Sequence, residues 1–177
     1  MKNSKKTRRP RGNQNYLVLL QGALSGILAT IPMTLFMGAA HYLLPKRQRY
    51  PLPPRLITLK AAEKVGLEDV IEEEPVYTLT TGAAHFGYGA DGGILYALLT
   101  RRVPLPPALN GILFGLTFWA AGYLGWLPAA GLLRPATEHP KERTALMIVS
   151  NVLYGITTAL FFESISKRRE FIREVKS

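Results

Sequence analysis

The sequence predicts an all-α membrane protein with four transmembrane helices, built as two parallel two-helix repeats, plus a short interfacial helix in the first loop. Three observations predict this fold: four long apolar segments separated by charged blocks, a similarity between the first and third segments, and glycines spaced along one face of each segment. A helix that crosses a bilayer takes about 20 mostly apolar residues, and each segment is at least that long. The charge distribution, more than the average composition, indicates a membrane protein.

The four predicted helices cover about residues 16–44, 76–99, 108–133 and 144–165, in one membrane domain at 16–165. The first segment has no Asp, Glu, Lys or Arg, and it exceeds the apolar region of about 7–15 residues that a signal peptide has. Between the first two segments, a Pro-rich stretch at 50–54 precedes residues 55–65, whose apolar side chains share one face before Gly66. We expect a short helix there, which lies along the membrane surface or packs on the protein as a solvated loop helix.

Basic residues predict the orientation. Thirteen Lys and Arg lie in the tails 1–15 and 166–177 and the loop 101–107, against nine in the two loops on the other side. The positive-inside rule therefore favours two basic tails in the cytoplasm. These tails are expected to contact anionic lipid.

Composition excludes several classes of function. The chain has no cysteine, and its three histidines lie in separate segments without metal-ligand spacing, so we expect no disulfide, metal or cofactor. The net charge of +10 comes from basic residues that lie next to the apolar segments, and this placement favours lipid over nucleic acid as the partner. No phosphate-binding loop, catalytic triad or carboxylate pair is present, so no catalytic residue is assigned.

An internal duplication is the most informative pattern. A shift of 89 positions places Gly22 and Gly26 on Gly111 and Gly115, and 7 of 24 positions from residue 21 to residue 44 are identical. Residues 85–89 and 151–155 share a polar-x-x-Tyr-Gly pattern. Two copies with an even number of crossings each would be parallel repeats.

Small residues lie on one stripe of each predicted helix, where they allow close approach between helices in lipid. We therefore expect a tight four-helix bundle with these stripes inside. The predicted packing glycines are Gly22, Gly26, Gly89, Gly93, Gly111, Gly115 and Gly155.

Three polar residues form a candidate intramembrane site: His85, Asp91 and Asn151. Asp91 lies near the middle of the second segment, where an ionised carboxylate costs roughly 2.5–3.5 kcal/mol, and it projects opposite the glycine stripe. Either this helix is covered on both sides or Asp91 meets a second subunit, which makes a homo-oligomer an expectation. Asp91 is read as a proton or cation relay, or as a protonated or hydrogen-bonded carboxyl that fixes packing. For His85 and Asn151 we expect a structural hydrogen bond between the two repeats.

A second candidate site is the charged loop that carries Arg134, Glu138 and His139. Such a loop could form a lid or an ion-binding mouth over the bundle. The alternative is a capped turn before the last helix.

Four short motifs stand out along the chain: the Gly-x-x-x-Gly and Ala-Thr-x-Pro-Met-Thr run of residues 22–34, the His-x-x-Tyr-Gly run at His85, Leu-Pro-Ala at Leu127 and His-Pro at His139. In these motifs the chain resembles the YagU-like small bacterial inner-membrane proteins, a group of unknown function. The resemblance covers most of residues 20–162 and implies residence in a bacterial inner membrane, without an activity. Members of the group often carry histidine at the position of Asn151. Because this chain has asparagine there, the departure weighs against a site made of two histidines.

Three functional hypotheses follow. The first is a non-enzymatic envelope or stress-adaptation protein. The second is a small oligomeric transporter or proton-linked channel with Asp91 and His85 along its path. The third is a membrane-embedded enzyme acting on lipid through Glu138 and His139.

Overall fold

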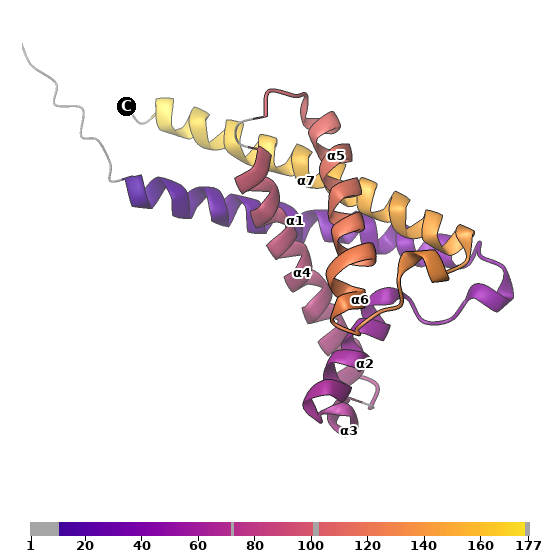
Figure 1. Cartoon of the computed structure of the whole chain (residues 1–177). Helices are drawn as coiled ribbons and strands as arrows, with labels where there is room; N and C mark the ends of the chain where they lie inside the picture. Colours follow the sequence, from indigo (N-terminus) through magenta and orange to yellow (C-terminus); the bar gives the residue numbers. More distant parts are fainter. Residues whose placement is uncertain (1–10, 72, 101–102, 176–177) are drawn as a thin grey trace, which may run out of the picture.

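The computed structural model describes residues 11–71, 73–100 and 103–175, and these form helices joined by turns. The long helices are α1 (Arg11–His41), α4 (Val76–Thr100), α5 (Pro107–Ala120) and α7 (Lys141–Val175) (Figure 1). The shorter elements are η1 (Lys46–Gln48), α2 (Pro53–Val65), α3 (Glu68–Ile71), η2 (Ala121–Trp126), α6 (Leu127–Ala129) and η3 (Ala136–Glu138). The predicted all-α class is confirmed for the described residues.

Three helical segments are long and apolar enough to cross a membrane, namely Asn15–His41, Pro107–Ala129 and Lys141–Ile172. The chain is therefore a helical membrane protein with three candidate spans. The predicted second crossing, α4, has the length at 25 residues but is not among them. Its glycines and threonines, together with His85 and Asp91, lower its hydropathy.

The ends of the helices differ from the predicted ones. α1 includes residues 11–15 of the predicted first tail and ends at His41, because the approach to Pro45 disfavours helical backbone. The other ten residues of that tail lie outside the described part. α7 begins directly after Pro140 and continues to Val175, through most of the predicted tail 166–177. No glycine or proline follows Gly155 to stop it, and Glu163 and Lys167 form an ion pair at 2.7 Å on its surface.

The third predicted helix is interrupted. α5 passes into η2, a π-helical segment in which Gly125 has non-helical backbone angles (φ −112°, ψ −105°). Pro128 lacks an N–H, so the carbonyl one turn before it has no helical donor there, and the chain widens into a π turn. The helix then ends with α6 at Ala129, short of the predicted residue 133.

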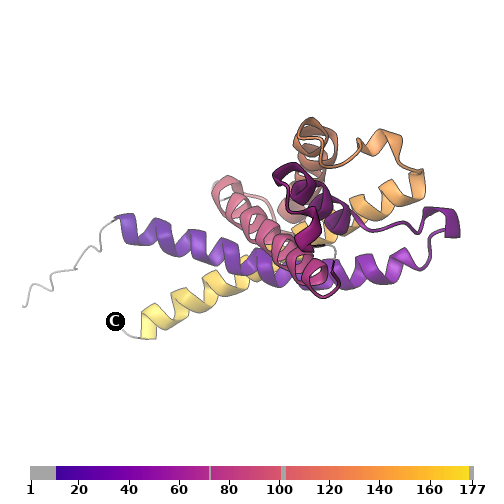
Figure 2. The ribbon, with the colours of Figure 1, turned by 90° about the horizontal axis from the view of Figure 1, so that it is seen from below.

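The helices pack as two antiparallel pairs, and a contact between α1 and α7 joins these pairs. On α1, Gly22 faces Gly93 of α4 and Gly26 faces Gly89, so the two helices run in opposite directions. In Figures 1 and 2, α4 crosses α1, α5 crosses α7, and the start of α1 and the end of α7 lie toward the same end of the molecule. α4 and α5 approach each other less closely and meet through aromatic side chains, among them Tyr88 and Phe118. The expected tight four-helix bundle stays a prediction.

The seven predicted packing glycines all lie at the two pair interfaces. On α5, Gly111 faces Gly155 of α7, and Gly115 faces the backbone of Asn151. A Cβ added at Gly115 would lie 2.9 Å from the Cα of Val152, which is backbone that cannot rotate away. A side chain there would push the helices apart, so close approach depends on glycine.

A buried arginine ties the Pro-rich stretch to the start of α7. Arg143 is 2% exposed, and its guanidinium donates to the carbonyl oxygens of Gln48 (2.9 Å), Tyr50 (3.0 Å) and Pro51. It also lies 3.6 Å from the centre of the Tyr50 ring. The carbonyls and the ring satisfy the buried cation. The backbone that leads into α2 is thereby held against α7.

The predicted short helix is present as α2, and it begins two residues earlier than predicted. Prolines at its first positions are tolerated because those N–H groups would be unpaired in any case, and Gly66 ends it in the left-handed conformation (φ 69°). An ion pair from Arg55 to Glu74 and a hydrogen bond from the Tyr77 hydroxyl to the Arg55 carbonyl (2.6 Å) hold α2 against the start of α4. The hydroxyl of Thr78 and the charge of Arg55 lower the pKa of Glu74 below its ordinary value.

Candidate functional site

A cavity of about 390 Å³ lies where α4 diverges from the second helix pair, between α1, α2, α4, η2 and α7. All three members of the predicted intramembrane polar site, His85, Asp91 and Asn151, line it. The rest of the lining is mainly apolar and aromatic. α2 forms one wall of the cavity, with Ile57 and Thr58 in contact with it.

Asp91 is exposed and borders this cavity. Within the described part of the chain, no hydrogen bond or ion pair involves its carboxylate. The sequence places Asp91 on the face of α4 away from the glycines, and in the structure this cavity lies beside that face. Although His85 and Asp91 are six residues apart, about 120° around the helix axis, the cavity is wide enough to contact both.

His85 comes from the same helix and contacts α1. Its Nε2 lies 3.1 Å from the hydroxyl oxygen of Thr34, and that hydroxyl donates its hydrogen to the carbonyl of Thr30 (2.7 Å). A threonine hydroxyl has one hydrogen, so Nε2 must be the donor in its contact with Thr34. The Nδ1 atom of neutral His85 is therefore left as a proton acceptor.

Asn151 approaches the cavity from α7. Its side-chain amide donates to the Met147 carbonyl (2.9 Å) in the preceding turn of the same helix. The expected hydrogen bond between His85 and Asn151 is not among the bonds of the described residues, in which His85 contacts Thr34 and Asn151 donates to its own helix. Both still line the same cavity, since α4 and α7 face it from two sides.

Three aromatic rings complete the cavity lining: Tyr88 of α4, and Tyr123 and Trp126 of η2. The Tyr88 ring stacks on Phe118 at 4.9 Å and lies 6.0 Å from Trp126. The π turn places Tyr123 and Trp126 at the cavity, and neither was predicted as a site residue. Gly125 and Pro128 were the available signal, because both interrupt a regular helix.

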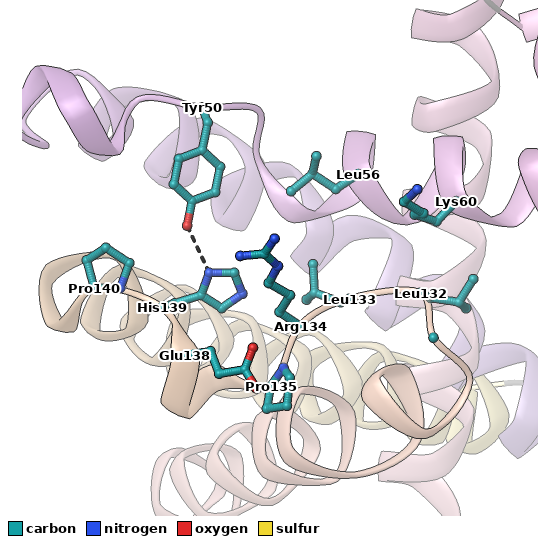
Figure 3. A pocket seen from close by; sticks show the side chains of 11 residues that line it. Tyr50, Leu56, Lys60, Leu132, Leu133, Arg134, Pro135, Glu138, His139 and Pro140 are labelled. Carbon is teal, nitrogen blue, oxygen red and sulfur yellow. Dashed lines mark hydrogen bonds between the residues drawn. The ribbon is translucent and has the colours of Figure 1, made fainter.

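A second cavity, of about 770 Å³, lies on the other face of α2, and the predicted loop residues Arg134, Glu138 and His139 all line it (Figure 3). The Tyr50 hydroxyl and His139 Nδ1 are hydrogen-bonded at 2.8 Å. Burial, and then the charge of Arg143, lower the pKa of His139 below its ordinary value. This hydrogen bond joins the loop to the Pro-rich stretch, so Tyr50 and His139 together form part of the cavity wall.

Among the described residues, no three His, Cys, Asp or Glu side chains are grouped in a way that could hold a metal ion. The two cavities offer carboxylate, imidazole, amide, guanidinium and aromatic groups to a ligand. No family model matches the chain, and neither does any curated protein or solved structure.

Proposed function

We propose that this protein crosses a bacterial inner membrane four times, with both termini in the cytoplasm, and binds a small organic cation in the cavity beside Asp91. Binding there is the substrate step of a proton-linked transporter. One observation carries the proposal. A carboxylate without a hydrogen bond or ion pair among the described residues borders a cavity within the helices that is lined by three aromatic rings.

The directions of the helices support a fourth crossing. α1 and α5 each run antiparallel to α7, so they run the same way. If both cross the membrane, the chain must return between them. α4 is antiparallel to α1, and its 25 residues extend about 37 Å, against a hydrocarbon thickness of about 30 Å. The positive-inside count supports cytoplasmic termini, and the resemblance to YagU-like proteins favours an inner membrane.

The chemistry of the cavity favours a cation. An ionised carboxylate within a membrane is costly until it has a partner, so a positively charged ligand would stabilise Asp91. The faces of Tyr88, Tyr123 and Trp126 carry negative electrostatic potential, which attracts ammonium groups. Met33 and Met37 offer adaptable apolar contacts for the body of the ligand. The volume falls within the range of about 300–1,000 Å³ that is typical of ligand sites.

The same cavity links binding to protons. Nδ1 of His85 is a proton acceptor in the same cavity as Asp91. In the proposed cycle, a proton on this imidazole and a cation beside Asp91 repel each other, so entry of the cation releases the proton, and this exchange is the coupling step of proton-linked transport.

Direct binding tests the site. Calorimetry on the full chain in detergent compares phenyltrimethylammonium with tert-butylbenzene, its uncharged isostere. We expect preference for the cation and at least about a tenfold loss of affinity in Asp91→Asn, which removes the charge and keeps the shape. Asp69→Asn on α3 removes an exposed carboxylate outside the cavity and should bind as the wild type does. Equal affinity of wild type and Asp91→Asn would refute the cation site.

Transport is tested separately in proteoliposomes with an imposed pH gradient. Uptake of the labelled cation should depend on the gradient and should be lost in Asp91→Asn. Binding without uptake would refute the transporter while leaving the cation site standing.

The cavity also bears on the other expectations. It gives Asp91 a position within one chain, so a second subunit is not needed to explain that residue. The homo-oligomer, the envelope or stress-adaptation role and the lipid enzyme stay predictions. The charged loop residues have their own cavity, and its chemistry points to binding.

A further inference from the structure

The cavity on the other face of α2 is lined by segments that lie next to the ends of candidate spans. Its lining comes from residues 50–60 and 131–140. These segments lie just beyond the ends of candidate spans at His41 and Ala129, and just before the one that begins at Lys141. A site placed there meets the polar surface of the bilayer.

Two cations line this cavity from opposite walls, Lys60 on α2 and Arg134 on the loop after α6. Figure 3 shows the Arg134 side chain between His139 and Leu133, extended toward α2. Its guanidinium makes no hydrogen bond or ion pair with the described residues. Lys60 pairs with Glu63 at 2.6 Å, but both groups are exposed, and such surface pairs contribute little. Both cations are therefore available to an anion.

The cavity also has an acidic group and an apolar wall. Glu138 is exposed, lines the cavity and forms no ion pair among the described residues. Leu56, Leu132 and Leu133 supply the apolar part of the lining. Two cations, one carboxylate and a leucine wall match a ligand that carries a phosphate, an amine and hydrocarbon.

We propose that this cavity binds the headgroup of a membrane phospholipid that has a primary amine on its phosphodiester. Lys60 and Arg134 contact the phosphate, Glu138 accepts hydrogen bonds from the ammonium group, and the leucines contact the start of the acyl chains. Guanidinium and ammonium groups form strong charge-assisted hydrogen bonds with phosphate oxygens. This site is separate from the cation cavity and does not depend on transport.

Native mass spectrometry on the delipidated full chain tests the proposal. The probes are dioctanoyl phosphatidylethanolamine, dioctanoyl phosphatidylglycerol and soluble phosphoethanolamine. We expect the wild type to prefer the ethanolamine lipid over both others. Preference for the glycerol lipid would overturn the role of the amine, and equal binding of soluble phosphoethanolamine would overturn the lipid as its source.

Variants test the residues. The double variant Lys60→Gln, Arg134→Gln should bind the ethanolamine lipid about tenfold more weakly. The matched control, Lys46→Gln with Arg47→Gln, removes two exposed cations from the same side of the molecule and should leave binding unchanged. Equal loss in both double variants would overturn the site in favour of general surface charge.

Glu138→Gln distinguishes a specific site from a folding defect. It should reduce the preference for ethanolamine over glycerol while keeping affinity for the glycerol lipid, and a misfolded protein would lose both. An unchanged preference would overturn the assignment of Glu138.

Discussion

The contact between α1 and α4 predicts a large effect from one methyl group. In Gly93→Ala, the new Cβ would lie 2.7 Å from the amide nitrogen of Gly26 and 2.8 Å from its Cα, with the carbonyl of Gly22 nearer still. These are backbone atoms, so no side-chain rotation relieves the overlap. Ordinary van der Waals contact begins at 3.4 Å, so the two Gly26 contacts alone require the helices to separate by about 0.6–0.7 Å, and the nearer Gly22 carbonyl requires more.

That separation loosens the whole interface. Overpacking of this kind costs about 1–3 kcal/mol. This cost is partly offset by about 0.5–1 kcal/mol of stability, because alanine restricts the unfolded chain and favours helix more than glycine does. The matched control is Gly82→Ala on the same helix, where an added Cβ meets nothing within 4 Å and only the helical gain applies. We therefore expect Gly93→Ala to be less stable than Gly82→Ala by about 1–3 kcal/mol.

The assay is reversible unfolding in mixed micelles, followed by circular dichroism as the denaturing detergent is increased. Gly82→Ala should unfold at or slightly above the wild-type midpoint, and Gly93→Ala clearly below it. Equal midpoints for the two alanine variants would refute the close approach of α1 and α4.

Two further predictions concern the loops. In the same titration, Arg143→Gln should lose about 2–4 kcal/mol, because the carbonyls of Gln48 and Pro51 lose their donor in a buried place, whereas the exposed control Arg47→Gln should stay within about 0.5 kcal/mol. A loss no larger than the control's would contradict the role given to Arg143. The second prediction is a pH dependence: the pKa of His139 is lowered in the folded protein, so its contribution to stability is present above the ordinary histidine pKa of about 6.5 and falls as the pH drops toward the lowered value. Unfolding at pH 7.5 and 5.5 should show a larger loss for the wild type than for His139→Gln, and equal losses would contradict it.

The sequence predicts the helices well and their partners poorly. Long uncharged segments indicate where α1, α5 and α7 lie, because apolar length is a property of each segment alone. Which helices touch depends on how two surfaces fit, and no single segment shows that. The aromatic contact between α4 and α5 is therefore absent from the pattern. The end of α7 also escaped prediction, since its charged residues suggest a tail but do not stop a helix.

The proposed repeat shows the same limit. The shared Tyr-Gly pattern aligns Gly89 with Gly155, yet in the structure Gly93 faces Gly22 as Gly155 faces Gly111. By these contacts Gly93 is the counterpart of Gly155, one helical turn further along the chain. The duplication itself stays a prediction. A pattern of identical letters does not determine the register in which two helices meet.

Among the site residues, Asp91 and His85 were conspicuous because ionisable groups stand out in an apolar helix. Trp126 was not, since its position depends on the π turn and an aromatic residue near the end of a span is ordinary. Arg143 looked like one of many flanking charges. Its role depends on carbonyls more than 90 residues away in sequence, a relationship that only the folded chain reveals.

Helix α2 forms a wall of both cavities, with Ile57 and Thr58 toward one and Leu56 and Lys60 toward the other. A ligand that shifts α2 when it binds in one cavity therefore changes the free energy of ligand binding in the other cavity. Linkage makes this effect reciprocal: if a bound headgroup tightens cation binding by some factor, the cation tightens headgroup binding by the same factor. The lipid composition of the membrane would then set the affinity of the cation cavity.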